Sequence, residues 1–127
     1  MNTPQNPVAW FGIRAADLDR AKRFYETVFA FTLQQAGAAE GANRFFIFPA
    51  NWQSHGTSGM LWHDPADTAT GHGGTTVFFE CADCEATAQA AVAAGGRLLQ
   101  GKYPIADGYA AFIEDSEGNR IGLHSRA

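Results

Sequence analysis

The sequence predicts an α+β fold made of two tandem β-α-β-β-β units, because one pattern is written twice. Residues 10–34 correspond to residues 76–100, and in both copies a strand pattern, in which alternate residues fall into two sets, leads into a helical pattern. Asp17 and Asp83 stand at matching places, where each can cap the helix that follows. We predict a single domain over residues 1–127, with module one at about 7–64 and module two at about 74–126.

The composition excludes several classes of function. The 127 residues are 46% hydrophobic, which is enough to bury a core. The net charge is −4, and the nine Lys and Arg residues are not clustered, so neither nucleic acid nor an anionic membrane is an expected partner. The polar start and the lack of an 18-residue apolar run predict a cytoplasmic protein.

The first module is predicted to contain one helix and four strands. The helix at 18–29 carries apolar residues on one face and charged residues on the other, as expected for a helix that covers a sheet. Strands are predicted at 8–14, 32–36, 44–49 and 57–62. The Gly-rich and Pro-containing linker 64–74 marks the module boundary.

The second module repeats this order. Its first strand is predicted at 76–81, and an Ala-rich helix follows Asp83 and stops at Gly95 and Gly96. Three more strands are predicted at 97–102, 108–114 and 120–124, separated by turns at 103–107 and 115–119. Cys81 and Cys84 lie where the first strand meets the helix, and we interpret them as small packing residues rather than as a redox or zinc pair.

Two motifs carry a resemblance to a known family. The run DLDRAKRFYETVF at 17–29 resembles the opening of the glyoxalase, bleomycin-resistance and extradiol-dioxygenase (vicinal oxygen chelate) superfamily, and DSEGNRI at 115–121 resembles its terminal turn and last strand. The resemblance implies that the strands curl into an open eight-stranded cup with the two helices outside and a ligand site inside. It also implies a small-molecule ligand and a homodimer.

The resemblance also implies which positions would hold a metal ion in a metal-dependent member of the family. The family's ligand positions, usually His, Gln or Glu, correspond here to Trp10, Leu61, Thr76 and Gly122. Divalent ions in such sites require imidazole and carboxylate ligands, which these four residues do not supply. We therefore predict that the protein has no metal site of the usual kind and no cofactor.

The histidines leave several alternatives open. His63 and His124 each lie two residues beyond Leu61 and Gly122, so the period of a strand returns them to the cup face, and alignment of the module ends pairs them. They are interpreted either as rim residues bonded to backbone or water, or as groups that contact ligand or transfer a proton. A third alternative is a displaced metal site completed by Glu80 or Glu114. His55 and His72, in Gly-containing loops, are predicted to be solvated surface residues.

Aromatic residues supply the remaining candidates. Strand parity and position select ten ligand-binding candidates, and ordinary core packing is the competing interpretation. The candidates are Trp10, Phe46, Phe48, Trp52, His63, Thr76, Phe78, Tyr103, Tyr109 and His124.

Three functions remain open. The first is a metal-free protein that binds a small hydrophobic or aromatic molecule, similar to the bleomycin-resistance branch. The second is a metal-dependent lyase or isomerase related to lactoylglutathione lyase (glyoxalase I). The third is a regulatory module that acts through a protein partner.

Overall fold

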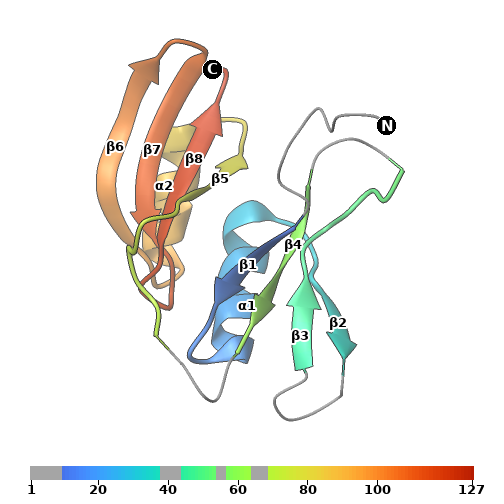
Figure 1. Cartoon of the computed structure of the whole chain (residues 1–127). Helices are drawn as coiled ribbons and strands as arrows, with labels where there is room; N and C mark the ends of the chain where they lie inside the picture. Colours follow the sequence, from blue (N-terminus) through green and yellow to red (C-terminus); the bar gives the residue numbers. More distant parts are fainter. Residues whose placement is uncertain (1–9, 38–43, 54–56, 64–68) are drawn as a thin grey trace.

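The computed structural model describes residues 10–37, 44–53, 57–63 and 69–127 of the chain, and it confirms the α+β fold with two β-α-β-β-β modules (Figure 1). The first module contains β1 (Phe11–Arg14), α1 (Leu18–Phe29), β2 (Gln34–Gly37), β3 (Arg44–Ile47) and β4 (Gly59–Trp62). The second contains β5 (Val77–Glu80), α2 (Cys84–Ala93), β6 (Arg97–Ile105), β7 (Gly108–Glu114) and β8 (Arg120–Ser125). Strand β6 runs on through residues 103–105, where the sequence predicted a turn.

Each module folds its strands into its own sheet. The strand orders are β1-β4-β3-β2 and β5-β8-β7-β6, so in both modules the first strand lies parallel to the last. The two sheets stay open and are separate four-stranded sheets. Their identical topology is the structural counterpart of the repeat in the sequence.

Both helices begin at the predicted aspartates. The Asp17 carboxylate accepts a hydrogen bond from the backbone N–H of Arg20 at 3.0 Å, and the Asp83 carboxylate accepts one from the N–H of Glu85 at 3.0 Å. Each carboxylate satisfies a backbone donor that has no partner within the helix, and its charge is favourable at the positive end of the helix dipole.

One hydrophobic core runs through both modules. Phe24 and Tyr25 of α1 are buried in it. Phe79 of β5 reaches across from the second module, with ring centroids 5.8 Å from Tyr25 and 4.8 Å from Phe29. In Figure 1 the helices lie behind the strands of both sheets, so this core is sandwiched between helices and strands.

Helix α2 packs through small side chains. Its buried residues are Cys84, Ala88 and Ala91. Both cysteines have free thiols, and burial raises the pKa of the Cys81 thiol, so that it is a poorer nucleophile than an exposed cysteine. The cysteines thus fill space beneath the helix, as the sequence predicts.

The turn between β7 and β8 bonds the two modules together. The hydroxyl of Tyr25, in α1, donates to Oδ2 of Asp115 at 2.7 Å, and both groups are buried. Asp115 Oδ1 accepts from the backbone N–H groups of Glu117 and Asn119, each at 2.8 Å. The Asn119 side-chain amide donates at 2.8 Å to the carbonyl of Arg14 in β1. The sequence showed this segment only as a turn.

Glu117 makes a second bond set to the first module. Its carboxylate accepts from Arg20 Nε at 2.7 Å and from the backbone N–H of Asp17 at 2.8 Å. Burial by itself would raise the pKa of Glu117, but the hydrogen bonds from Arg20, Asp17 and Ser116 outweigh it and leave the pKa lowered. The carboxylate is therefore held in its charged form against α1.

Neither helix is long and apolar enough to cross a membrane, within the residues that the structure describes.

Candidate functional site: the open face of the two sheets

The strands turn one set of side chains toward the helices and the alternating set toward the other side, which we call the open face. On β4, Leu61 points into the core, so its neighbours Met60 and Trp62 belong to the open face. Cross-strand partners share a face, which assigns the rest. The open face comprises Gly12, Arg14, Phe45, Ile47, Met60 and Trp62 in the first module, and Phe78, Glu80, Ala110, Phe112, Glu114, Arg120, Gly122 and His124 in the second.

Three aromatic candidates do not lie on the open face. Phe46 and Phe48 are each 3% exposed and belong to the core, where Phe48 packs edge-on against Tyr25 at 5.3 Å. Tyr109 packs against the same core, and Lys102 Nζ lies 4.5 Å from its ring centroid. The expectation that Phe46 and Phe48 face the cup is wrong, because residues 45–48 are all apolar and give no alternation from which to assign a face.

The alignment of the module ends was wrong by one residue. Gly12 pairs with Met60 and Phe78 pairs with Gly122, so Met60, and not Leu61, corresponds to Gly122. By the same register Trp62 is the counterpart of His124.

His63 therefore does not share the open face. Its Nδ1 bonds the backbone carbonyl of Ala15 at 2.9 Å, which makes it a strand-end residue held by the main chain. The expected pairing of His63 with His124 is wrong. Both Leu61 and Met60 are apolar, so the pattern of β4 left its register undecided.

In the first module the open face carries two aromatic contacts. Trp10 stacks on Trp52 with centroids 5.9 Å apart and an interplanar angle of 16°, and the two side chains are 38% and 74% exposed. The Arg14 guanidinium lies 4.8 Å from the Trp62 ring centroid. A Cβ atom at Gly12 would lie 3.1 Å from Trp62 Nε1, so glycine gives this indole room to lie against the strand.

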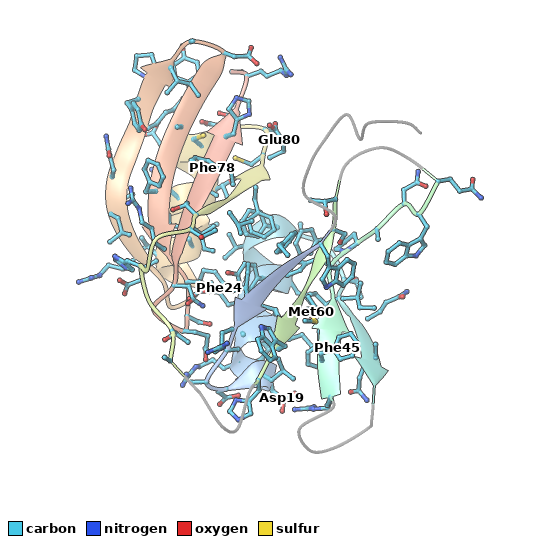
Figure 2. All side chains as sticks on the ribbon, viewed as in Figure 1. Asp19, Phe24, Phe45, Met60, Phe78 and Glu80 are labelled. Atoms are coloured by element: carbon cyan, nitrogen blue, oxygen red, sulfur yellow. The ribbon has the colours of Figure 1, made fainter. Side chains whose placement is uncertain are left out.

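In the second module the open face carries a row of rings. Phe78 lies over Gly122, and a Cβ atom there would come within 2.4 Å of the Phe78 ring. Phe112 meets Phe78 edge-on at 5.5 Å and stacks with Tyr103 at 6.4 Å. The Arg120 guanidinium lies 4.2 Å from the Phe112 centroid. Phe78, labelled in Figure 2, is 52% exposed, so its ring is available to a ligand.

The sequence analysis missed Phe112 and Arg120. The available signal was their alternation on adjacent strands with the buried residues Ala111, Ile113 and Ile121. Thr76, a candidate that precedes β5, is half-buried.

The residues at the family's ligand positions do not fit a divalent metal. With the corrected register these positions are Trp10, Met60, Thr76 and Gly122, which together offer one hydroxyl and one thioether. The ring of Phe78 covers Gly122, so the space beside that position holds an aromatic side chain. Within the described residues no group of three His, Cys, Asp or Glu side chains is arranged to hold an ion.

His124 is engaged at both ring nitrogens. Its Nδ1 bonds the carboxylate of Glu80, and its Nε2 bonds the carbonyl of Asp107 at 2.7 Å. Because both partners are acceptors, they stabilise the doubly protonated imidazolium. The pKa of His124 is raised, mainly by the hydrogen bond to the Asp107 carbonyl and next by the hydrogen bond to Glu80. The arrangement leaves neither nitrogen free to ligate a metal or accept a proton from a substrate.

The other two histidines fall outside this arrangement. His72 is exposed, and its Nε2 pairs with Glu114 at 2.8 Å. His55 lies outside the described residues.

A pocket of about 400 Å³ opens between the modules. Gly12, Arg14 and Trp62 of the first module contribute to its wall, and Arg120 contributes from the second. Residues 69–71, 73 and 75 line it as well. The pocket thus brings together open-face residues from both sheets.

The sequence matches the family model described as Glyoxalase/Bleomycin resistance protein/Dioxygenase superfamily over residues 8–123. The chain belongs to this superfamily. The match spans both modules and includes the opening and terminal motifs on which the resemblance rested. No curated protein matches the chain.

Solved structures of superfamily proteins share the fold. A glyoxalase/bleomycin resistance protein from Albidiferax ferrireducens T118 is 21% identical, with a TM-score of 0.69 and coverage of 95% of this chain and 100% of that one. TnmS3, an antibiotic binding protein from Streptomyces sp. CB03234, is 22% identical, with a TM-score of 0.70 and coverage of 99% and 100%. A mutant of glyoxalase I from Zea mays is 18% identical, with a TM-score of 0.71, and the match covers 99% of this chain but 49% of that one. Identities this low show a common fold alone.

Proposed function

We propose that this protein binds a small hydrophobic or aromatic molecule on its open face without a divalent metal. The observation that carries the proposal is that the family's ligand positions supply no imidazole or carboxylate, and that aromatic rings lie against the open face beside them. Phe78 lies over Gly122 where a superfamily enzyme would hold a metal, and Trp62 lies against Gly12 in the first module. A planar molecule gains contact area from such a surface, and aromatic geometry adds about 0.5–1.5 kcal/mol.

The metal-dependent lyase or isomerase is the alternative, and the donor set argues against it. A metal in such an enzyme polarises a carbonyl oxygen, which requires at least three firm protein ligands. Trp10, Met60, Thr76 and Gly122 supply no imidazole and no carboxylate. An antibiotic-binding protein among the solved structures with this fold is in keeping with ligand binding.

N-phenyl-1-naphthylamine, a neutral planar dye whose emission rises in apolar surroundings, tests the proposal. We expect saturable binding with a rise in dye emission. Phe78→Ala should weaken binding about 10-fold, since it removes an exposed ring from the open face and leaves the core intact.

Leu98→Ala is the matched control, because Leu98 is 49% exposed and lies beside α2, away from the open face. Its affinity for the dye should stay within about 2-fold of the unmodified protein. Dye emission that does not rise, or equal loss in both variants, would refute binding on the open face. Zinc, nickel, iron or manganese retained through gel filtration at about one ion per chain would refute the metal-free proposal.

A further inference from the structure

The pocket between the modules is lined by cationic side chains in an acidic protein. Arg14 and Arg120 stand on walls contributed by different modules, whereas the chain as a whole has a net charge of −4. Among the described residues that line the pocket there is no Asp or Glu. The charged side chains of the described lining are therefore both cationic.

Arg120 offers its guanidinium to a ligand. Its described side-chain interaction is with the ring of Phe112, at 4.2 Å, which orients the planar group but leaves its N–H donors available. The carboxylate opposite it on β7, Glu114, is committed elsewhere, to His72 at 2.8 Å and Arg97 at 3.1 Å. The hydrogen bond with His72, and to a smaller extent the one with Arg97, lower the pKa of Glu114. The Glu114 carboxylate is thus paired with these two side chains.

Arg120 also connects the pocket to the aromatic row. It lines the pocket and lies on Phe112, which in turn meets Phe78 edge-on at 5.5 Å. A ligand whose ring rests on Phe112 and Phe78 could place a substituent in the pocket. The substituent that the Arg120 guanidinium favours is an oxyanion, because a guanidinium donates paired N–H groups to a carboxylate or sulfonate.

We infer that the protein selects planar aromatic ligands that carry a single anionic group, with the ring on the Phe78–Phe112 row and the anion in the pocket at Arg120. This inference rests on the proposed function and specifies the chemical class of its ligand. Neutral aromatic molecules bind to the same rings with lower affinity.

The matched probes 2-naphthoate and 2-naphthamide test this inference, since they share a ring and a shape and differ in charge. Titration calorimetry at low salt should give at least 10-fold tighter binding of 2-naphthoate. Arg120→Gln should weaken 2-naphthoate about 10-fold and 2-naphthamide by less than 2-fold. Arg120→Lys should recover part of the affinity, because it restores the charge without the fork of donors.

Arg23→Gln is the control, because it removes one positive charge from an exposed position on α1, on the helix side of the sheet. It should leave the affinity for both probes within 2-fold. Equal affinity for the two probes, or equal loss in Arg120→Gln and Arg23→Gln, overturns the inference. If N-phenyl-1-naphthylamine still binds in that case, the proposed function stands; if none of the three compounds binds, the proposed function falls with it.

Discussion

Tyr25→Phe removes one buried hydrogen bond between the modules and nothing else from the packing. Tyr25 is fully buried, and its hydroxyl donates to Asp115 Oδ2 at 2.7 Å. After the substitution the phenyl ring keeps its place against Phe24 and Phe48. Among the described residues, Oδ2 then retains only the Asn119 amide, at 3.1 Å, as a donor. The variant therefore measures how much this contact stabilises the fold.

The magnitude follows from the charge of the acceptor. A hydrogen bond to a charged group contributes about 1.5–3 kcal/mol, and a buried acceptor that loses its donor costs a similar amount. The entropy of unfolding is about 2.1 cal/mol/K per residue, or about 0.27 kcal/mol/K for a chain of this length. We therefore expect Tm to fall by about 6–11 °C at pH 7.

The pH dependence distinguishes a lost hydrogen bond from a packing defect. Burial raises the pKa of Asp115, and the bonds from Tyr25 and Asn119 oppose that rise. Without the hydroxyl the pKa should rise further, because a donor to the ionised form is gone. A carboxyl group whose pKa is higher in the folded state than in the unfolded state destabilises the fold at pH values above the folded-state pKa. The loss of unfolding free energy caused by Tyr25→Phe should therefore become smaller as the pH falls through that pKa.

Thermal unfolding followed by circular dichroism at pH 7 and at pH 4 provides the assay. Tyr103→Phe is the control: the Tyr103 hydroxyl makes no hydrogen bond within the described residues, so its change should stay within about 0.5 kcal/mol. A fall in Tm below 2 °C for Tyr25→Phe, or the same fall at both pH values, would refute this account of the contact.

Two further predictions concern His124 and assembly. The Asp107 carbonyl and Glu80 raise the pKa of His124, so the stability it contributes is fully present below about pH 6.5 and is lost as the pH rises through its folded pKa. His124→Gln should therefore lower Tm more at pH 6 than at pH 9 in the same melting assay, and an equal loss at both would contradict the imidazolium assignment. The protein is also proposed to form a homodimer, and a sedimentation equilibrium mass near twice that of the chain at tens of micromolar is expected, whereas the mass of a single chain, 13.6 kDa, would exclude the dimer.

The placement of the elements could be predicted because local chemistry dictates it. Asp17 and Asp83 cap their helices as expected, since a short acidic side chain satisfies the backbone donors of the first turn wherever the helix packs. The duplication was visible because each copy keeps its own strand and helix periods. Phe78 was predicted to face away from the helices, and the strand's period of two, counted from the helix-side residue Phe79, places it there, in register with Gly122.

Part of the candidate site could not be predicted, because the strands concerned are apolar on both faces. In β3 and β4 a shift of one residue moves every side chain to the other face, and Phe45, Phe46, Met60 and Leu61 resemble one another too closely to fix the shift. Packing against α1 sets the register of these strands, because Phe46 and Leu61 are buried in the core together with the apolar residues of the helix.

By itself the sequence determined the two modules, their helix caps and the family to which the chain belongs, because each rests on short-range pattern. Only the tertiary structure decided that Arg120 stands on the wall of a pocket opposite Arg14, 106 positions away in the chain. It likewise decided that Asp115 bonds Tyr25 and that Glu80 holds His124. These contacts join residues that are far apart in the chain, and which of them meet is set by the burial of a shared core rather than by any local preference.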